Sequence, residues 1–284
     1  MLRIGRYEIA TALDATFALD GGAMFGIVPR PLWEREIAPD ARNRIPLAAR
    51  CLVAVDRAAR RVVLVDDGIG ERWDAKRTDI FCIQRPEGGL GGALARLGIA
   101  ATDVTDVLLT HLHFDHAGGT TRRGPDGRLA LAFPKATYHI QRQAWQWAHA
   151  PTERDRGSFR DEDFELLQHS NQLHLVEGEV DLFPDVELIV CEGHTAGQQL
   201  PCFRGEGTQL TFCGDVIPTH AHLRTSWIMG YDLQPLISIE EKKVLLAEAL
   251  EEDGILVFEH DPAMPACRLA ERDGEVVVRE PVQL

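Results

Sequence analysis

The sequence predicts an α/β protein with four layers, in which helices cover the outer faces of two packed β-sheets. Two observations support this fold class. Apolar strand-like segments come in runs, and helical segments lie between some of them and follow others singly. No repeat, linker or low-complexity tract divides the chain, so we expect one domain over residues 1–284.

The strand segments are short apolar runs that end in glycine or polar residues. They cover residues 60–70, 101–110, 131–140, 186–193, 208–216, 255–262 and 274–280. We expect the last of these at the edge of a sheet. The helical segments cover residues 88–100, 141–150, 160–170 and 238–254. The first helical segment is closed by Gly98, and the last is amphipathic and stops at Gly254.

Composition and charge argue against several classes of protein. Hydrophobic residues make up 45% and charged residues 26% of the chain, as in ordinary globular proteins. The net charge of −14 disfavours nucleic acid as a partner, because such binding needs clustered Lys and Arg. No apolar run reaches the ~18 residues of a spanning helix, and no secretory signal is visible. We therefore expect a cytoplasmic protein without membrane contact, whose six cysteines are reduced.

An unusual concentration of ionisable residues follows one predicted strand. The stretch THLHFDH (110–116) places four ionisable side chains within six positions. In an extended segment residues i and i+2 point the same way, so His111 and His113 can reach one ion together. Asp115 and His116 lie beyond the strand, where the chain turns, and can aim at a second point. Imidazole and carboxylate groups suit zinc and similar ions, so we expect a metal centre rather than a surface turn.

Three further strand ends carry ligand-type residues: CEGHTAG (191–197), FCGDV (212–216) and FEHDP (258–262). With THLHFDH and LVDDG (64–68), these stretches resemble the motifs of the metallo-β-lactamase-fold hydrolases, in the same order and at similar spacing. The resemblance covers most of the chain and implies the four-layer αββα sandwich of that fold. The motifs are specific for fold and metal binding but not for substrate, because this fold hosts many chemistries.

The resemblance implies two metal sites. Three histidines would hold the first ion: His111, His113 and His194. One aspartate and two histidines would hold the second ion: Asp115, His116 and His260. Asp215 would bridge both ions, where the β-lactamases proper supply a cysteine to the second site, and Asp66 would orient a ligand or cap a turn. We expect two zinc ions, with manganese, iron or cobalt as alternatives.

The implied activity is hydrolysis of a lactone or a carboxylic ester. Two divalent ions about 3.5–4 Å apart can share one water and lower its pKa toward ~7, which provides a hydroxide at neutral pH. Asp115 is also a candidate catalytic residue, because it can return a proton to the leaving group. The sequence THLHFDHAGG and the late His-Asp pair are similar to those of the N-acyl-homoserine lactone lactonases.

Other activities remain open. A phosphoester or organophosphate hydrolase and a thioesterase of the glyoxalase II type resemble this chain in their ligands. The mononuclear iron persulfide dioxygenases resemble it in the first motif, but the complete second ligand set argues against them. A non-catalytic metal-binding protein is disfavoured, because no ligand has been lost. The number and identity of the bound ions would separate these alternatives.

The polar contact to a small-molecule substrate has three candidates. The lactonases carry a tyrosine soon after the bridging aspartate, whereas this chain continues as GDVIPTHAHLRTSW. We expect the contact from one of three residues further along: His220, His222 or Tyr231.

The N-terminal stretch LDGGAMFGIVPRPLW (19–33) is a second candidate for substrate contact. It resembles a segment of lactonase-like and organophosphate-hydrolase-like members of the superfamily. Its apolar, adaptable Met24 and Phe25 are expected to line the pocket. Residues 1–45 as a whole are expected to serve as a substrate-lining extension or as the contact of a homodimer, which the resemblance implies.

Overall fold

Two large β-sheets form the centre of the computed structural model, which describes residues 1–284. The first sheet contains, in spatial order, β1 (Leu2–Ile4), β2 (Tyr7–Asp20), β3 (Arg44–Asp56), β4 (Arg61–Val65), β5 (Asp106–Leu108), β8 (Thr137–Gln141) and β9 (Leu173–Val176). The second contains β10 (Val180–Phe183), β11 (Val186–Cys191), β12 (Gln198–Gly205), β13 (Thr208–Phe212), β14 (Ile255–Val257), β15 (Ala266–Arg272) and β16 (Glu275–Pro281). A separate hairpin consists of β6 (Thr121–Arg123) and β7 (Leu129–Leu131).

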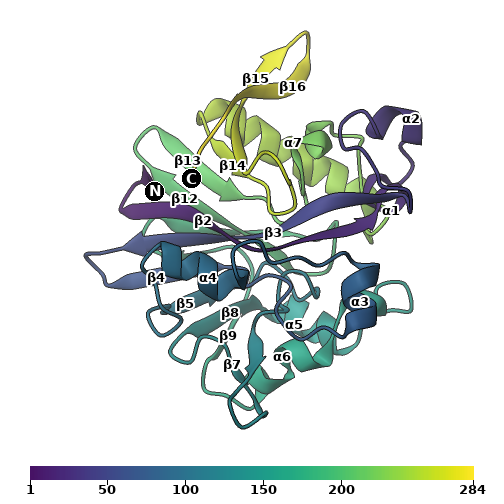
Figure 1. Ribbon diagram of the computed structural model, residues 1–284. Coiled ribbons are helices and arrows are strands. Elements are labelled where there is room, and N and C mark those ends of the chain that lie inside the picture. Colours follow the sequence, from purple (N-terminus) through teal and green to yellow (C-terminus); the bar gives the residue numbers. More distant parts are fainter.

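Helices cover the outer face of each sheet (Figure 1). Three helices lie on the first sheet: α4 (Gly89–Arg96), α5 (Arg142–His149) and α6 (Asp161–Gln168). One long helix, α7 (Pro235–Glu251), covers the second sheet. Short helices occupy the loops: α1 (Gly21–Phe25), α2 (Arg30–Trp33), α3 (Ala75–Ile80), η1 (Arg156–Ser158) and η2 (His220–Leu223). The αββα layering predicted from the sequence is confirmed, and β16 is an edge strand as expected.

The inner core lies between the two sheets. Leu52 and Val63 of the first sheet meet Leu188 and Phe212 of the second, and all four side chains are fully buried. Each such side chain contributes roughly 1.5–3 kcal/mol by leaving water. The short apolar runs of the sequence are therefore strands with both faces covered, one by the other sheet and one by helices.

The strand ends that carry ionisable residues meet at one edge of the sandwich. β4 and β5 run parallel, so the segments that begin at Asp66 and Thr110 leave the first sheet at the same edge. β13 and β14 are likewise parallel in the second sheet, and Asp215 and His260 follow them. Because neighbouring parallel strands end at a common edge, four loops far apart in the sequence are brought together.

The N-terminal segment differs from the prediction. β2 pairs with β3 from Glu8 opposite Val55 to Asp20 opposite Arg44, so residues 2–20 belong to the first sheet and do not form an extension. The physical reason is the composition of β2, whose many alanines pack closely but give a weak hydrophobic alternation. Only the residues between the two strands, with α1 and α2, leave the sheet.

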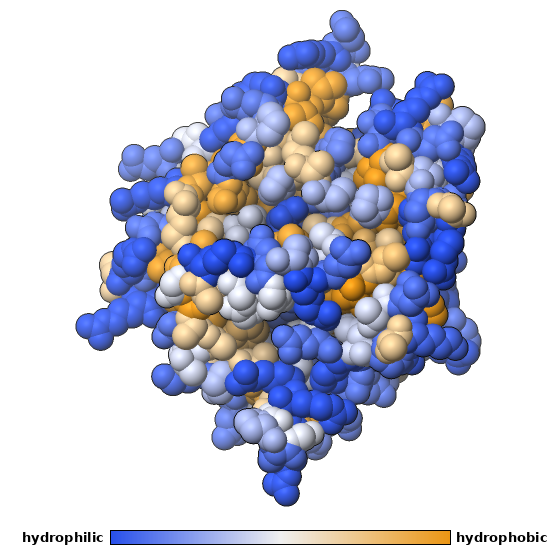
Figure 2. Space-filling view, viewed as in Figure 1, coloured by the Kyte–Doolittle hydropathy of each residue, from blue (hydrophilic) through white to orange (hydrophobic).

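Polar residues dominate the visible surface of the molecule (Figure 2). All six cysteines are free thiols, as the sequence predicts, and five of them are buried. None of the helices combines the length and the apolar character that crossing a bilayer requires.

Candidate metal centre

The first ligand pair lies just after β5. Leu112 points into the core, whereas the imidazoles of His111 and His113 face the edge of the sandwich. The Nε2 atom of His111 and the Nδ1 atom of His113 are 2.9 Å apart. Alternation along an extended segment thus places both rings at one point, as the sequence indicates.

The next residues form a tight turn. The amides of His116 and Ala117 both donate to the carbonyl of His113, which swings Asp115 and His116 away from the first pair. Two glycines follow, and their role is close packing: a Cβ on Gly118 would lie 2.4 Å from the carbonyl oxygen of Ile69. Neither glycine needs a positive φ angle, so the turn itself does not explain them.

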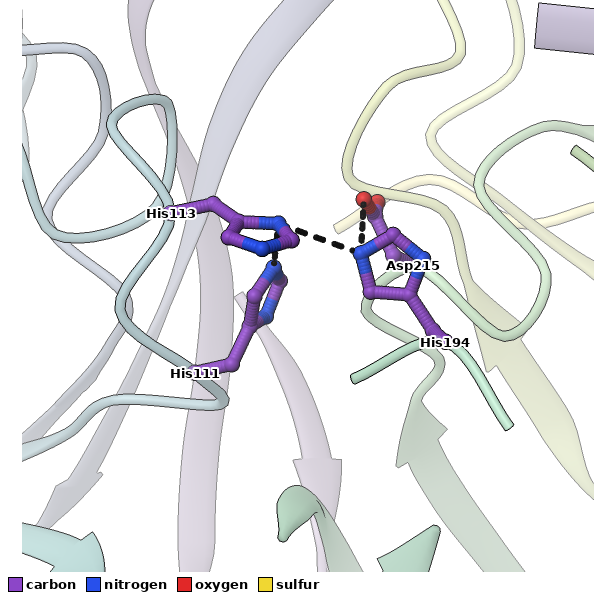
Figure 3. A group of neighbouring side chains, drawn as sticks. All are labelled: His111, His113, His194 and Asp215. Carbon is purple, nitrogen blue, oxygen red and sulfur yellow. Dashed lines mark hydrogen bonds and ion pairs between the residues drawn. The ribbon is translucent and has the colours of Figure 1, made fainter. Parts of the chain in front are cut away.

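The second sheet supplies the remaining ligands. His194 follows β11 and Asp215 follows β13. The Nε2 atom of His194 lies 3.2 Å from Nδ1 of His113 and 3.2 Å from Oδ2 of Asp215. Figure 3 shows these side chains, with His111, converging from opposite sides on one small volume.

A second group lies beside the first. It contains Asp115, His116 and His260, whose ligand atoms lie within 4.8 Å of one another. Asp215 faces this group with its other oxygen: Oδ1 is 3.0 Å from Nε2 of His260 and 3.5 Å from Nε2 of His116. The two groups therefore share one carboxylate, and all seven residues implied by the resemblance meet here.

The far nitrogen of most of these imidazoles is held by a hydrogen bond. Nδ1 of His194 donates to Asp232 at 3.0 Å, and Nδ1 of His260 donates to the main-chain carbonyl of Ala48 at 2.8 Å. Nδ1 of His111 lies 3.0 Å from Thr110 Oγ1. Each such bond fixes the tautomer that leaves the lone pair of Nε2 directed into the centre. This is the arrangement typical of histidines that bind metal ions.

Asp66 holds His116 in the same way. Its Oδ2 atom lies 3.0 Å from Nδ1 of His116, and it also accepts hydrogen bonds from the amide and hydroxyl of Thr110. A second carboxylate lies close by: Oε2 of Glu259 is 2.9 Å from the same nitrogen, although neither oxygen of Glu259 forms a hydrogen bond. Glu259 is fully buried, and burial raises its pKa. Neither Glu259 nor Asp232 was predicted from the sequence, although both stand beside predicted site residues.

We predict that Asp66→Asn and Glu259→Gln each weaken metal binding by about 10–100-fold, since both carboxylates lie within 3.0 Å of Nδ1 of His116. Competition with a chromophoric chelator measures the affinity. Asp106→Asn is a matched control, because it removes a buried Asp–His contact of 2.9 Å, to His139, outside the centre. Equal affinity in Glu259→Gln, Asp106→Asn and the unmodified protein would show that Glu259 does not support the ligand.

The electrostatics differ between the imidazoles: the carboxylate of Asp215 outweighs burial and raises the pKa of His260 to about 9, whereas His111 and His113 favour the neutral form. Burial, together with the neighbouring imidazoles, lowers the pKa of His111 and of His113 well below the usual value. Both rings are therefore unprotonated at neutral pH and can bind a cation. Neutral imidazoles combined with carboxylates form the donor set that zinc and related divalent ions prefer. The first pair can thus bind a cation directly, whereas His260 must release its proton when an ion binds.

A cavity of about 280 Å³ opens onto this centre. Its floor is formed by four site residues: His113, Asp115, His194 and His260, with Asp215 beside them. Its walls are mainly apolar: Leu19, Met24, Phe81, Phe114 and Met229. Tyr231 also lines the cavity, and burial raises its pKa to about 12, so its hydroxyl keeps its proton at neutral pH.

The structure places only some of the candidate substrate residues at the cavity. Met24 and Tyr231 line the cavity, but Phe25 does not, because it is fully buried between the rings of Trp33 and His222. His222 is also buried, and its Nε2 donates to the main-chain carbonyl of Met24. Of the two expected apolar contacts, only Met24 therefore reaches the cavity.

His220 likewise lies outside the cavity wall. Its Nδ1 atom forms a short contact with the buried carboxylate of Asp261, and this hydrogen bond raises its pKa. His220 and His222 thus anchor the loop after Asp215 instead of facing a substrate. The physical reason is long-range packing, since Asp261 and the carbonyl of Met24, the partners of these rings, lie in other loops.

The buried His222 predicts an acid sensitivity. Burial, assisted by the charge of Lys242, lowers its pKa to about 3, against ~6.5 when unfolded. The unfolded chain binds the proton first, so the stability is complete above pH 6.5 and declines as the pH falls toward 3. Between pH 7 and 5.5 the free energy of unfolding should fall by roughly 1 kcal/mol more than in His222→Gln. Denaturant titration of both proteins measures this difference, and parallel pH profiles would contradict it.

Comparison with known proteins agrees with the geometry. A probable metal-dependent hydrolase from Staphylococcus aureus has the same fold, with a TM-score of 0.86 and 28% identity over 99% of this chain and 100% of that one. A probable metallo-hydrolase of Mycobacterium tuberculosis is 25% identical over 84% of this chain and 85% of its own length. The N-acyl homoserine lactonase AttM of Rhizobium radiobacter is 26% identical over 67% of each chain.

The fold and the site define a metal-dependent hydrolase. The family model described as the metallo-beta-lactamase superfamily matches residues 50–260, which include every residue of both ligand groups. The chain belongs to this superfamily.

Proposed function

We propose that this protein binds two divalent metal ions, most readily zinc, and hydrolyses a lactone or a carboxylic ester. The observation that carries the proposal is the position of Asp215. One of its oxygens faces the group of His111, His113 and His194, and the other faces His260. A carboxylate between two ligand groups is the arrangement that a dinuclear centre needs.

When bound, such ions would acidify a water and polarise the carbonyl of the substrate. The side chains of this protein would transfer the proton and bind the substrate. Asp115 lies at the cavity floor, where it can hold a proton and return it to the leaving oxygen. The hydroxyl of Tyr231 is protonated and can donate a hydrogen bond to the carbonyl oxygen as negative charge develops on it. The apolar walls would exclude water around the acyl group.

The substrate class is supported by the cavity and by the relatives. Five apolar side chains line the walls, which suits an acyl or aryl group. Several relatives, from Bacillus and Rhizobium, are named N-acyl homoserine lactonases. Phosphotriesters and thioesters are the competing substrate classes for the same centre.

A substrate panel tests the proposal. The zinc-loaded protein is assayed with N-hexanoyl homoserine lactone, an aryl butyrate, an alkyl thioester and an aryl phosphotriester. We expect kcat/KM for the lactone or the carboxylic ester to exceed that for the phosphotriester by more than about tenfold. Removal of the metal should abolish turnover, and added zinc should restore it. A preference for the phosphotriester or the thioester would contradict the proposed substrate class.

A further inference from the structure

One cation stands on the wall of the cavity. Arg154, in the loop between α5 and η1, is the only lysine or arginine among the lining residues. Its side chain is exposed while also lining the cavity, so it lies at the entrance. The rest of the wall is apolar apart from the tyrosine hydroxyl and Ser158. A lone charge in such a wall indicates a group that a bound molecule must match.

Arg154 is not neutralised by a protein carboxylate. Its hydrogen bonds run to two main-chain carbonyls, those of Gly230 and Asp232, and both come from the same terminal nitrogen. Some other exposed arginines of this chain pair with acids, as Arg30 does with Glu34 and Arg57 with Glu8, but the unpaired Arg154 is the one that lines the cavity. A guanidinium has five N–H donors, so three remain free on Arg154.

The two carbonyls hold the guanidinium in a defined place. They flank Tyr231, which lines the cavity, and one of them belongs to Asp232, whose side chain orients His194. Arg154 therefore connects its own loop to the loop that carries these residues. Its position is tied to the centre, unlike that of a freely moving surface arginine, and a fixed guanidinium loses less entropy when it binds an anion.

The negative net charge of the protein gives this arginine a role in attracting anionic substrates. With a net charge of −14, the protein repels anions at long range. An unpaired arginine at the cavity entrance offsets that repulsion locally. A substrate with a carboxylate away from its scissile carbonyl could place that carboxylate on Arg154 while its acyl chain contacts the apolar wall.

We infer that Arg154 is a specificity-determining residue, and that the preferred substrate is an ester or lactone bearing a carboxylate remote from the scissile bond. This inference rests on the proposed hydrolase function. It narrows the substrate class from neutral acyl compounds to acidic ones. A charge-assisted contact at a partly exposed site corresponds to about a tenfold preference.

Two esters that share a leaving group test the inference. The zinc-loaded protein is assayed with 4-nitrophenyl hemiglutarate, which carries a carboxylate, and with neutral 4-nitrophenyl hexanoate. We expect kcat/KM to favour the hemiglutarate about tenfold, mainly through KM. In Arg154→Met this ratio should fall to near one, and Arg154→Lys should keep part of it. Arg156→Met, an exposed arginine outside the cavity lining, is the matched control and should keep the full ratio.

The outcomes are decisive. A ratio near one in the unmodified protein overturns the inference, and so does an unchanged ratio in Arg154→Met. An equal loss of activity on both esters in that variant leaves the ratio unchanged and would show that Arg154 only anchors the loops.

A binding measurement separates this inference from the proposed function. Calorimetry compares glutarate with butyrate on the zinc-loaded protein, with the zinc content checked in every variant. If no ester is hydrolysed but glutarate binds more tightly than butyrate only when Arg154 is present, the hydrolase proposal fails and the carboxylate site stands. If hydrolysis occurs without any preference for the acidic compounds, the reverse holds.

Discussion

Asp215→Asn should abolish hydrolysis. The aspartate is the only residue whose two carboxylate oxygens face both ligand groups, at 3.2 Å from His194 and 3.0 Å from His260. An amide keeps the shape but removes the negative charge and turns one oxygen into a donor that points at the ions. Loss of an outer-shell partner alone costs about 10–100-fold, so we expect loss of a shared ligand to exceed ~100-fold in kcat/KM.

The assay is ester turnover at saturating zinc, with the bound metal counted in the same samples. Asp126→Asn, an identical change in the exposed turn between β6 and β7, serves as the control for handling and loading. Circular dichroism and thermal unfolding verify that the Asp215 variant is folded. Near-normal turnover in a folded Asp215→Asn protein would mean that the two groups do not act as one centre.

Asp115→Asn should lower kcat far more than it raises KM. The side chain of Asp115 is 9% exposed, lies at the cavity floor, and has Oδ2 at 3.7 Å from Nε2 of His260. It can therefore face both the second ion and the leaving group. Losing a general acid or base typically costs 10²–10⁴-fold in rate, so we expect kcat to fall by at least ~100-fold.

Zinc saturation and the dependence on the leaving group distinguish this role from simple ligation. If Asp115 only holds an ion, saturating zinc should restore turnover in the variant. If it also moves a proton, turnover stays low at full metal occupancy, and esters with good leaving groups are affected least because they need no proton. Full activity of Asp115→Asn with normal metal content would exclude the proton-transfer role.

The metal ligands could be predicted from the sequence because each one lies just after an apolar strand segment, where polar residues begin. His111 and His113 share a face through the two-residue period, which is a local property. Asp215 and His260 are not local to them. Their meeting depends on parallel strand pairs that end at one edge, and only the resemblance implied it from the sequence.

The supporting residues could not be predicted in the same way. Glu259 precedes a ligand in the sequence, yet its carboxylate lies beside His116, which belongs to another loop. Phe25 and His222 stack on one another across 197 positions of the chain, so nothing local marked them as core. The strand β2 was missed because alanines give little contrast between its two faces.

The role of Tyr231 also could not be predicted from the sequence alone. Three polar residues after Asp215 were equivalent candidates in the sequence, and only the fold separates them. His220 and His222 find partners in Asp261 and in the carbonyl of Met24, whereas Tyr231 lines the cavity. Whether a side chain faces a cavity depends on long-range packing, which a short motif does not predict.

The central claim is that the two ligand groups hold two metal ions that share Asp215. Elemental analysis of the purified protein, by plasma mass spectrometry against total protein, tests this most directly. The proposal predicts about two divalent ions per chain, zinc foremost, and clearly fewer in His113→Ala. A single iron per chain, with oxygen consumed on a persulfide and no ester turned over, would contradict it.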